Sequence, residues 1–135
     1  MRTAIICLIA VFLLNLVGMY FNWYEFFWFD MVLHYLGGFF IALLFYHYLR
    51  PHFLPNVKLH NFLVLVGAVM FIGVVWEFFE YILNQTAREA AQAAFGLRVD
   101  FMGDMNDTMT DLLMDMLGGF TIAGLHLGRS RKRHS

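Results

Sequence analysis

Three apolar stretches of this sequence each carry titratable residues three or four positions apart: an Asp and a His in the first, and acidic residues in the other two. Side chains at that spacing share one face of an α-helix. Carboxylate oxygens together with one imidazole form a ligand set suited to a hard or borderline divalent cation such as Mg, Mn, Ca or Zn. The spacing therefore predicts a metal site. Its predicted ligands are His34, Glu77, Glu80, Asp107, Asp111 and Asp115, with Asp30 and Asp104 in support.

The composition places the chain among membrane proteins. Hydrophobic residues make up 61% of the 135 residues and charged residues 14%, whereas soluble domains contain about 45–50% apolar and about 25% charged residues. Four stretches reach the roughly 20 residues that a helix needs to cross a bilayer. They cover residues 3–23, 30–49, 61–83 and 108–128. We expect an all-α, polytopic membrane protein with four transmembrane helices in a single domain.

The basic residues predict how these helices are oriented. Seven of the nine Lys and Arg residues lie near the N-terminus, between the second and third spans, or in the tail 129–135. Positive residues favour the cytoplasmic side of a membrane. We therefore expect a protein of the inner (plasma) membrane with both termini in the cytoplasm and an outer loop at 84–107.

The outer loop is predicted to contain a short surface helix between the third and fourth spans. Thr86 and Glu89 have the spacing of a capping box at the start of such a helix. Gly96 is suited to end it, because glycine readily takes the left-handed conformation found at helix C-termini.

The acidic faces are expected at a similar depth below the outer membrane surface. A helix rises 1.5 Å per residue, so His34 lies about 6 Å inside the second span, Glu77 about 9 Å inside the third and Asp115 about 12 Å inside the fourth. Small residues let membrane helices approach closely. Glycines lie near each acidic set, at Gly37, Gly38, Gly73, Gly118 and Gly119. We expect three helices to bring their acidic faces together.

Such convergence requires a compensating positive charge. Two carboxylates about 4 Å apart repel each other by roughly 4 kcal/mol at an effective dielectric constant of about 20. No Lys or Arg lies within the four predicted spans. Three remedies are open: a bound cation, protons shared between carboxylates, or Arg88 and Arg98 reaching down from the outer loop. We favour the cation.

Some of these residues also have an ordinary structural role that could explain them without a metal. Asp30 and Asp107 fit the N-terminal caps of the second and fourth spans, where an acid meets the positive end of the helix dipole. Glu77 and Glu80 lie near a helix C-terminus, where the dipole disfavours an anion, and Asp115 lies two turns inside its helix. These three residues therefore weigh more in the metal prediction. Trp76 is predicted to pack or to contact lipid.

Three segments resemble the signature blocks of the YjdF-like family of small bacterial inner-membrane proteins. The segments are "DMVLHYLGG", "GVVWEFFEYIL" and "GDMNDTMTDLLMDMLGG", and the family pattern reads D-x-x-L-H, E-x-x-E and G-D-x-x-D-x-x-x-D. The resemblance covers about residues 30–120 and implies a helical membrane bundle, typically with more than four spans, that carries this polar constellation. The matching positions are Asp30, Leu33, His34, Glu77, Glu80, Gly103, Asp104, Asp107 and Asp111. A fainter likeness to VanZ-like proteins rests on the Asp and His that begin the second span.

Three functions are compatible with this sequence. The first is a metal-dependent enzyme that acts on a lipid head group or pyrophosphate at the outer leaflet. The second is a non-catalytic membrane module whose polar cluster fixes helix packing or docks a partner. The third is a metal or proton conductor, which would need an oligomer because polar residues do not continue to the cytoplasmic side. Membrane lipids are the expected partners, and the net charge of −1 gives no indication of nucleic acid.

Overall fold

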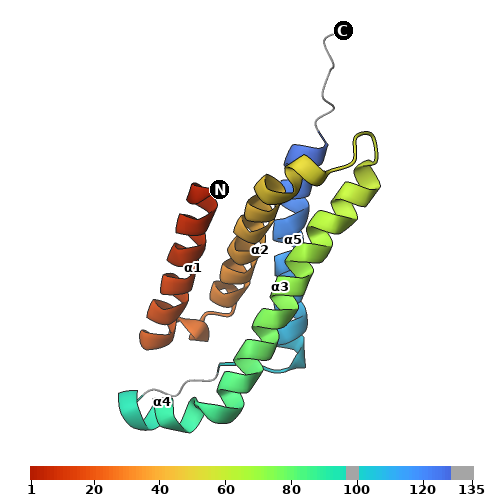
Figure 1. Ribbon diagram of the computed structural model, residues 1–135. Coiled ribbons are helices and arrows are strands. Elements are labelled where there is room, and N and C mark those ends of the chain that lie inside the picture. Colours follow the sequence, from red (N-terminus) through yellow and green to blue (C-terminus); the bar gives the residue numbers. More distant parts are fainter. Residues whose placement is uncertain (97–100, 129–135) are drawn as a thin grey trace.

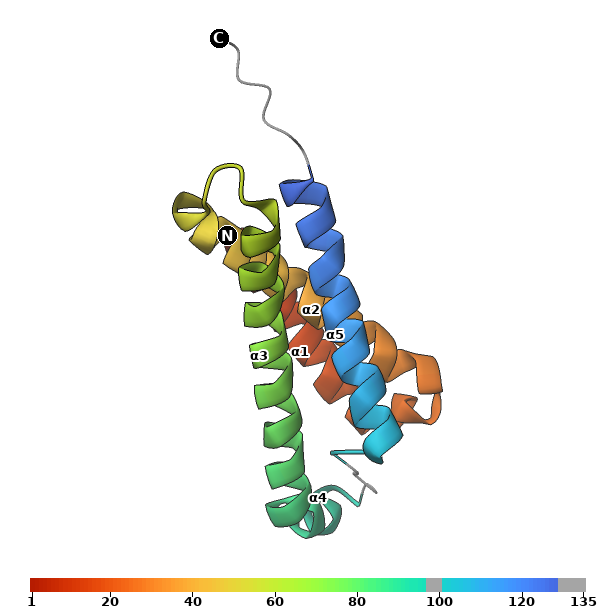
Figure 2. The same cartoon turned by 90° about the vertical axis from the view of Figure 1, so that its right-hand side faces the viewer.

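Four long helices run alternately up and down to form an all-helical bundle (Figure 1). The computed structural model describes residues 1–96 and 101–128, and within them it contains no strand. The N-terminus of α1 and the C-terminus of α5 lie at one end of the bundle, and α4 lies at the other (Figures 1 and 2). The elements are α1 (Arg2–Tyr20), η1 (Trp23–Glu25), α2 (Phe27–Leu49), η2 (Arg50–His52), α3 (Lys58–Thr86), α4 (Arg88–Phe95) and α5 (Met105–Leu127).

Residues with special backbone preferences separate these helices. Asn22 follows α1 in the left-handed conformation, with φ of 58°, a region that Asn tolerates better than most residues. Pro51 follows the end of α2 and begins the 3-10 turn η2, since proline cannot continue the hydrogen-bond ladder of a helix. Gly96 ends α4 with φ of 66°, as predicted.

Two predicted helix starts are wrong. The helix α2 begins at Phe27 with Phe26 as its N-cap residue, so Asp30 lies inside the first turn and does not cap the helix. The reason is the compact turn at η1, which allows the helix to start three residues earlier than the apolar pattern indicates. The helix α4 starts after Ala87 without a side-chain cap, because the Thr86 hydroxyl donates to the carbonyl of Ile82 instead.

Three helices are long and apolar enough to cross a membrane, namely Arg2–Tyr20, Phe27–His52 and Lys58–Thr86. The fourth predicted span forms the 23-residue helix α5, but the same criteria do not select it among the described residues. Buried Asp111 and Asp115 lie on this helix and reduce its apolar character. A fourth crossing and the membrane side of each terminus therefore stay predictions. The predicted basic tail lies outside the described residues.

The helix α2 is the centre of the bundle, since it contacts α1, α3 and α5. It approaches α5 closely because both helices present glycine at their crossing. A Cβ atom added at Gly38 would overlap the backbone of Asp115, and one added at Gly118 would overlap the backbone of Tyr35 and Phe39. The predicted close approach is thus confirmed at these two glycines, while Gly119 makes only ordinary contacts with Val69.

An apolar core fills the half of the bundle that lies toward the C-terminus of α2. Its buried residues come from α2, α3 and α5, and are Ala42, Leu65, Val66, Val69, Ile122 and Ala123. The buried acidic residues all lie in the other half, nearer the N-termini of α2 and α5. We call that half the acidic end; it contains Asp30, His34, Glu77, Glu80, Asp111 and Asp115.

Gly118→Ala should destabilise the bundle and displace α5 from α2, because the added methyl group meets backbone that cannot move aside. Overpacking of this kind costs roughly 1–3 kcal/mol of unfolding free energy. Thermal unfolding in detergent measures the loss. Gly124→Ala on the same helix is the matched control, since nothing lies within 4 Å of its Cβ position and alanine favours a helix by up to about 1 kcal/mol. Equal midpoints for the two variants would contradict close α2–α5 packing.

Candidate functional site

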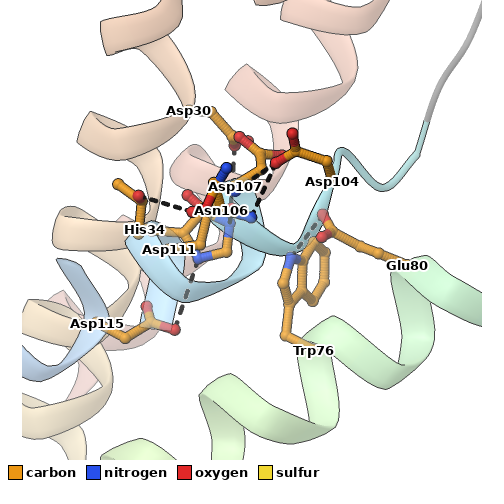
Figure 3. A network of polar contacts seen from close by, with 10 residues as sticks. Asp30, His34, Trp76, Glu80, Asp104, Asn106, Asp107, Asp111 and Asp115 are labelled. Carbon is orange, nitrogen blue, oxygen red and sulfur yellow. Dashed lines mark hydrogen bonds and ion pairs between the residues drawn. The ribbon is translucent and has the colours of Figure 1, made fainter. Parts of the chain in front are cut away.

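His34 lies at the centre of a group of carboxylates from α2 and α5 (Figure 3). Its Nε2 atom is 3.7 Å from Asp30 Oδ1 and 4.0 Å from Asp111 Oδ2. Its Nδ1 atom is 3.5 Å from Asp115 Oδ2. The four-residue spacing of Asp30 and His34 places both on one face of α2, and the same spacing places Asp111 and Asp115 on one face of α5. The predicted meeting of these two faces is present.

The helix α3 adds two further carboxylates to the acidic end. Glu77 and Glu80 are both buried on the face that α3 turns toward the bundle. The indole N–H of Trp76 donates a 2.8 Å hydrogen bond to Glu80 Oε1 (Figure 3). This bond occupies one oxygen of Glu80 and holds the carboxylate in place. Trp76 thus contacts the site. The sequence analysis missed this role, although Trp76 lies four residues before Glu80 and so shares its helix face.

The buried carboxylates are not fully satisfied by the protein. Exposed fractions of the central side chains range from 2% for Asp111 to 8% for Glu80. Glu77 Oε1 and Asp111 Oδ1 are buried without a hydrogen-bond partner among the described residues. A buried polar atom without a partner costs about 1–3 kcal/mol, and more when the group is charged. These two oxygens therefore favour a ligand that is positively charged or donates hydrogen bonds.

Two overlapping groups of side chains have the separation needed to hold a metal ion. One is Asp30, His34 and Asp111, and the other is His34, Glu77 and Glu80. In each group the ligand atoms lie within 4.8 Å of one another. Two atoms that each lie about 2.1 Å from one ion are at most about 4.2 Å apart. The 3.7 and 4.0 Å distances from His34 Nε2 satisfy this limit, and any other pair of ligand atoms that is up to 4.8 Å apart would have to move closer to share an ion.

Asp115 stands beside these groups and contacts His34 from the opposite ring nitrogen. Its carboxylate fits between α2 and α3 because residue 73 is glycine. A Cβ atom at Gly73 would lie 2.5 Å from Asp115 Oδ2. The contact with Nδ1 leaves the Nε2 atom facing Asp30 and Asp111. Asp115 is therefore placed to orient the imidazole.

The two acids at the start of α5 have roles different from those predicted. Asp104 is the N-cap residue, and its Oδ1 accepts hydrogen bonds from the backbone N–H groups of Asn106 and Asp107 at 2.8 and 3.1 Å (Figure 3). The prediction that Asp107 caps this helix is wrong, because the helix begins at Met105 and places Asp107 in its first turn. Asp107 is partly exposed and packs against Gly103. Neither acid is in the two candidate metal groups.

Tyr24 is a further polar residue at the acidic end that the sequence analysis did not single out. Its hydroxyl is buried without a hydrogen-bond partner among the described residues. Burial raises the pKa of Tyr24 far above its ordinary range, and the charges of Asp30 and Glu80 raise it further. The hydroxyl therefore stays neutral and available as a donor.

Arg88 and Arg98 of the predicted outer loop are the alternative counterions for the carboxylates around His34. Arg88 begins α4 and is exposed. Arg98 lies outside the described residues. Positive charge inside the cluster itself is available from His34 when protonated, as the ion-pair distances show.

Asp104→Ala should lower the free energy of unfolding by about 1 kcal/mol, because two backbone N–H groups of α5 lose their acceptor. Asp104→Asn should retain stability to within a few tenths of a kcal/mol, since Asn caps about as well as Asp. Thermal unfolding of both variants beside the wild type measures the difference. If Asn destabilised as much as Ala, the negative charge of Asp104 would matter and the cap assignment would be insufficient.

Comparison with known proteins agrees with the membrane character of the chain. The family described as "Predicted membrane protein (DUF2238)" matches residues 1–132. An uncharacterised protein of Thermotoga maritima is 33% identical over 129 residues, covering 90% of this chain and 60% of that protein, so the chain spans less than two thirds of this relative. No solved structure matches. With nearly its whole length matched, the chain belongs to the DUF2238 family of predicted membrane proteins.

Proposed function

We propose that this protein binds a divalent metal ion at its acidic end and presents it to the phosphate group of a membrane lipid. The observation that carries the proposal is the pair of buried, unpartnered carboxylate oxygens on Glu77 and Asp111. Both lie in groups of side chains with metal-ligand spacing around His34. The YjdF-like blocks of the sequence contain the same residues, so the resemblance extends the proposal to that family.

The charge balance supports a cation over an unoccupied cluster. Five carboxylates share one imidazole, and the segments 27–49, 59–86 and 105–127 contain no Lys or Arg. A single carboxylate at the centre of a membrane costs roughly 2.5–3.5 kcal/mol on insertion scales. One divalent ion would neutralise two of these charges and supply the missing partner of Asp111 or of Glu77, according to which of the two groups holds it. A site that combines one imidazole with carboxylates suits Mn or Zn better than Mg or Ca, which favour oxygen ligands alone.

A phosphate is the ligand that best completes such a site. A bound divalent ion polarises phosphoryl oxygens and lowers the pKa of bound water. The neutral hydroxyl of Tyr24 is buried and has no hydrogen-bond partner among the described residues, so in this proposal it donates to a phosphate oxygen. Asp115 orients His34 through Nδ1, so that Nε2 serves as a ligand or accepts a proton. In the predicted orientation, the site binds a phosphate-bearing head group from the outer leaflet. A reaction on that head group would be a separate activity, which needs its own test.

Transport along a single chain is disfavoured by the packing beyond the site. The apolar core around Leu65, Val69 and Ile122 fills the space between α2, α3 and α5 on the other side of His34. A conducting path needs polar groups or water through that region. Only an oligomer with a path between subunits would permit conduction.

Mn²⁺ at about 100 times its dissociation constant should raise the unfolding free energy of the wild type by about 2.7 kcal/mol. Asp111→Asn should abolish this response. In metal-free buffer the same variant should be at least as stable as the wild type, because it removes one of several buried like charges. Thermal unfolding with and without Mn²⁺, and elemental analysis of the purified protein, measure both effects.

Glu25→Gln is the matched control, since Glu25 is an exposed acid in η1 whose carboxylate accepts a hydrogen bond from the side-chain amide of Asn22. This variant should retain the full Mn²⁺ response. Arg88→Ala tests the alternative counterion. If Mn²⁺ and Zn²⁺ left the unfolding midpoint of the wild type unchanged and Arg88→Ala unfolded at a lower temperature, the counterion of the cluster would be Arg88 and not a metal ion. Metal binding without turnover of any lipid phosphate would reduce the function to a non-catalytic module.

A further inference from the structure

A cavity of about 340 Å³ lies between α1, α2 and α3 and reaches Asp115 of α5. Most of its wall is apolar, formed by Leu8 and Val11 of α1, Ile41 of α2 and Ile72 of α3. The three helices that enclose it are the three long and apolar enough to cross a membrane. The cavity is therefore enclosed by helices that are suited to cross the hydrocarbon layer of a membrane.

Polar residues gather at one end of this cavity. On α1 the cavity is lined by Asn15 toward the acidic end and by Leu8 seven residues away. On α2 the corresponding pair is His34 and Ile41, again seven residues apart. Seven residues of helix span about 10 Å. The cavity thus runs from the candidate metal site along the helices and becomes apolar as it leaves the site.

We propose that this cavity holds one hydrocarbon chain of the lipid whose phosphate group the acidic end binds. An engineered apolar cavity of about 150 Å³ stays free of water and binds benzene, and this cavity is about twice that size. Its deep part offers water too few polar partners. The molecules that surround these helices in a membrane are hydrocarbon chains, which can fill it.

The packing of α1 provides a lateral route for such a chain. The helix α1 contacts α2 along its length and meets α3 through the edge of the Phe12 ring on Trp76, 6.3 Å between ring centroids. Both of these aromatic residues line the cavity. A chain entering beside them would extend toward the bilayer centre with its polar group at His34 and Asp115, the orientation of a lipid in the leaflet at the acidic end. The head-group part of this inference rests on the proposed function, and the chain part does not.

The test uses a brominated single-chain lysophosphatidic acid, because bromine quenches nearby tryptophan fluorescence. Trp23→Phe and Trp28→Phe leave Trp76 as the remaining tryptophan of the three, on the cavity wall. In detergent we expect saturable quenching of Trp76 at one probe per chain. Val11→Phe fills the cavity and should weaken the apparent affinity by about tenfold or more. Ile72→Phe fills it from α3 and serves as the second variant if the first misfolds.

Leu13→Phe is the matched control, since Leu13 is exposed on α1 and does not line the cavity. It should leave the affinity within about twofold of the wild type. Non-saturable quenching, or equal affinities for Val11→Phe, Ile72→Phe and Leu13→Phe, would overturn the proposal, since the probe would then contact Trp76 only from the micelle or bind a second copy's surface.

A neutral probe separates this inference from the metal site. Brominated monoacylglycerol has the same chain without the phosphate. If the metal proposal failed, Mn²⁺ and Asp111→Asn would affect neither probe, yet both probes would still quench Trp76 in a manner sensitive to Val11→Phe. If the chain proposal failed alone, Mn²⁺ would strengthen binding of the phosphate probe, and filling the cavity would change neither probe.

Discussion

Buried negative charge around a single imidazole is the constraint on which this structure depends. Asp30, Glu77 and Asp111 come from three different helices, and each loses hydration when these helices pack. Their mutual repulsion would separate the helices unless positive charge or shared protons lie between them, and the segments that supply them contain no Lys or Arg. His34, which reaches α5 from α2, is one source of positive charge when it is protonated. The proposed cation would be a second source and would also be a partner for a remaining carboxylate oxygen.

The rest of the bundle is divided according to this constraint. Away from the acidic end, α2, α3 and α5 pack through aliphatic side chains around Leu65 and Ile122, which supply cohesion that the charged half cannot. Close backbone approach at Gly38 and Gly118 joins the two halves, because it fixes the distance between α2 and α5 next to Asp115. The looser helix α1 contributes little to that core and instead encloses the cavity beside the site. The apolar core is thus formed by α2, α3 and α5, whereas α1 joins α2 and α3 around the cavity.

The sequence predicted the convergence because helical spacing is sufficient to define a face. Asp30 with His34, and Asp111 with Asp115, needed only the 3.6-residue period and the nearby glycines to be placed together. The ends of the helices could not be read in this way. Asp104 rather than Asp107 caps α5 because the chain enters the helix in an extended conformation at Asp104, which the acidic repeat does not reveal. Tyr24 was missed because its contact with the site depends on the fold of a turn, and turns carry no periodic signal.

The arrangement around His34 has the geometry that the proposed metal site requires. Metal-binding histidines commonly donate their second ring N–H to a carboxylate, which fixes the tautomer and the ring orientation. Asp115 occupies that position at Nδ1, and it does so because Gly73 leaves room for its carboxylate against α3. The Nε2 atom is then directed toward Asp30 and Asp111. Gly73 thus makes room for the Asp115 carboxylate, and Asp115 in turn sets the ring orientation of His34 that the proposed cation site requires.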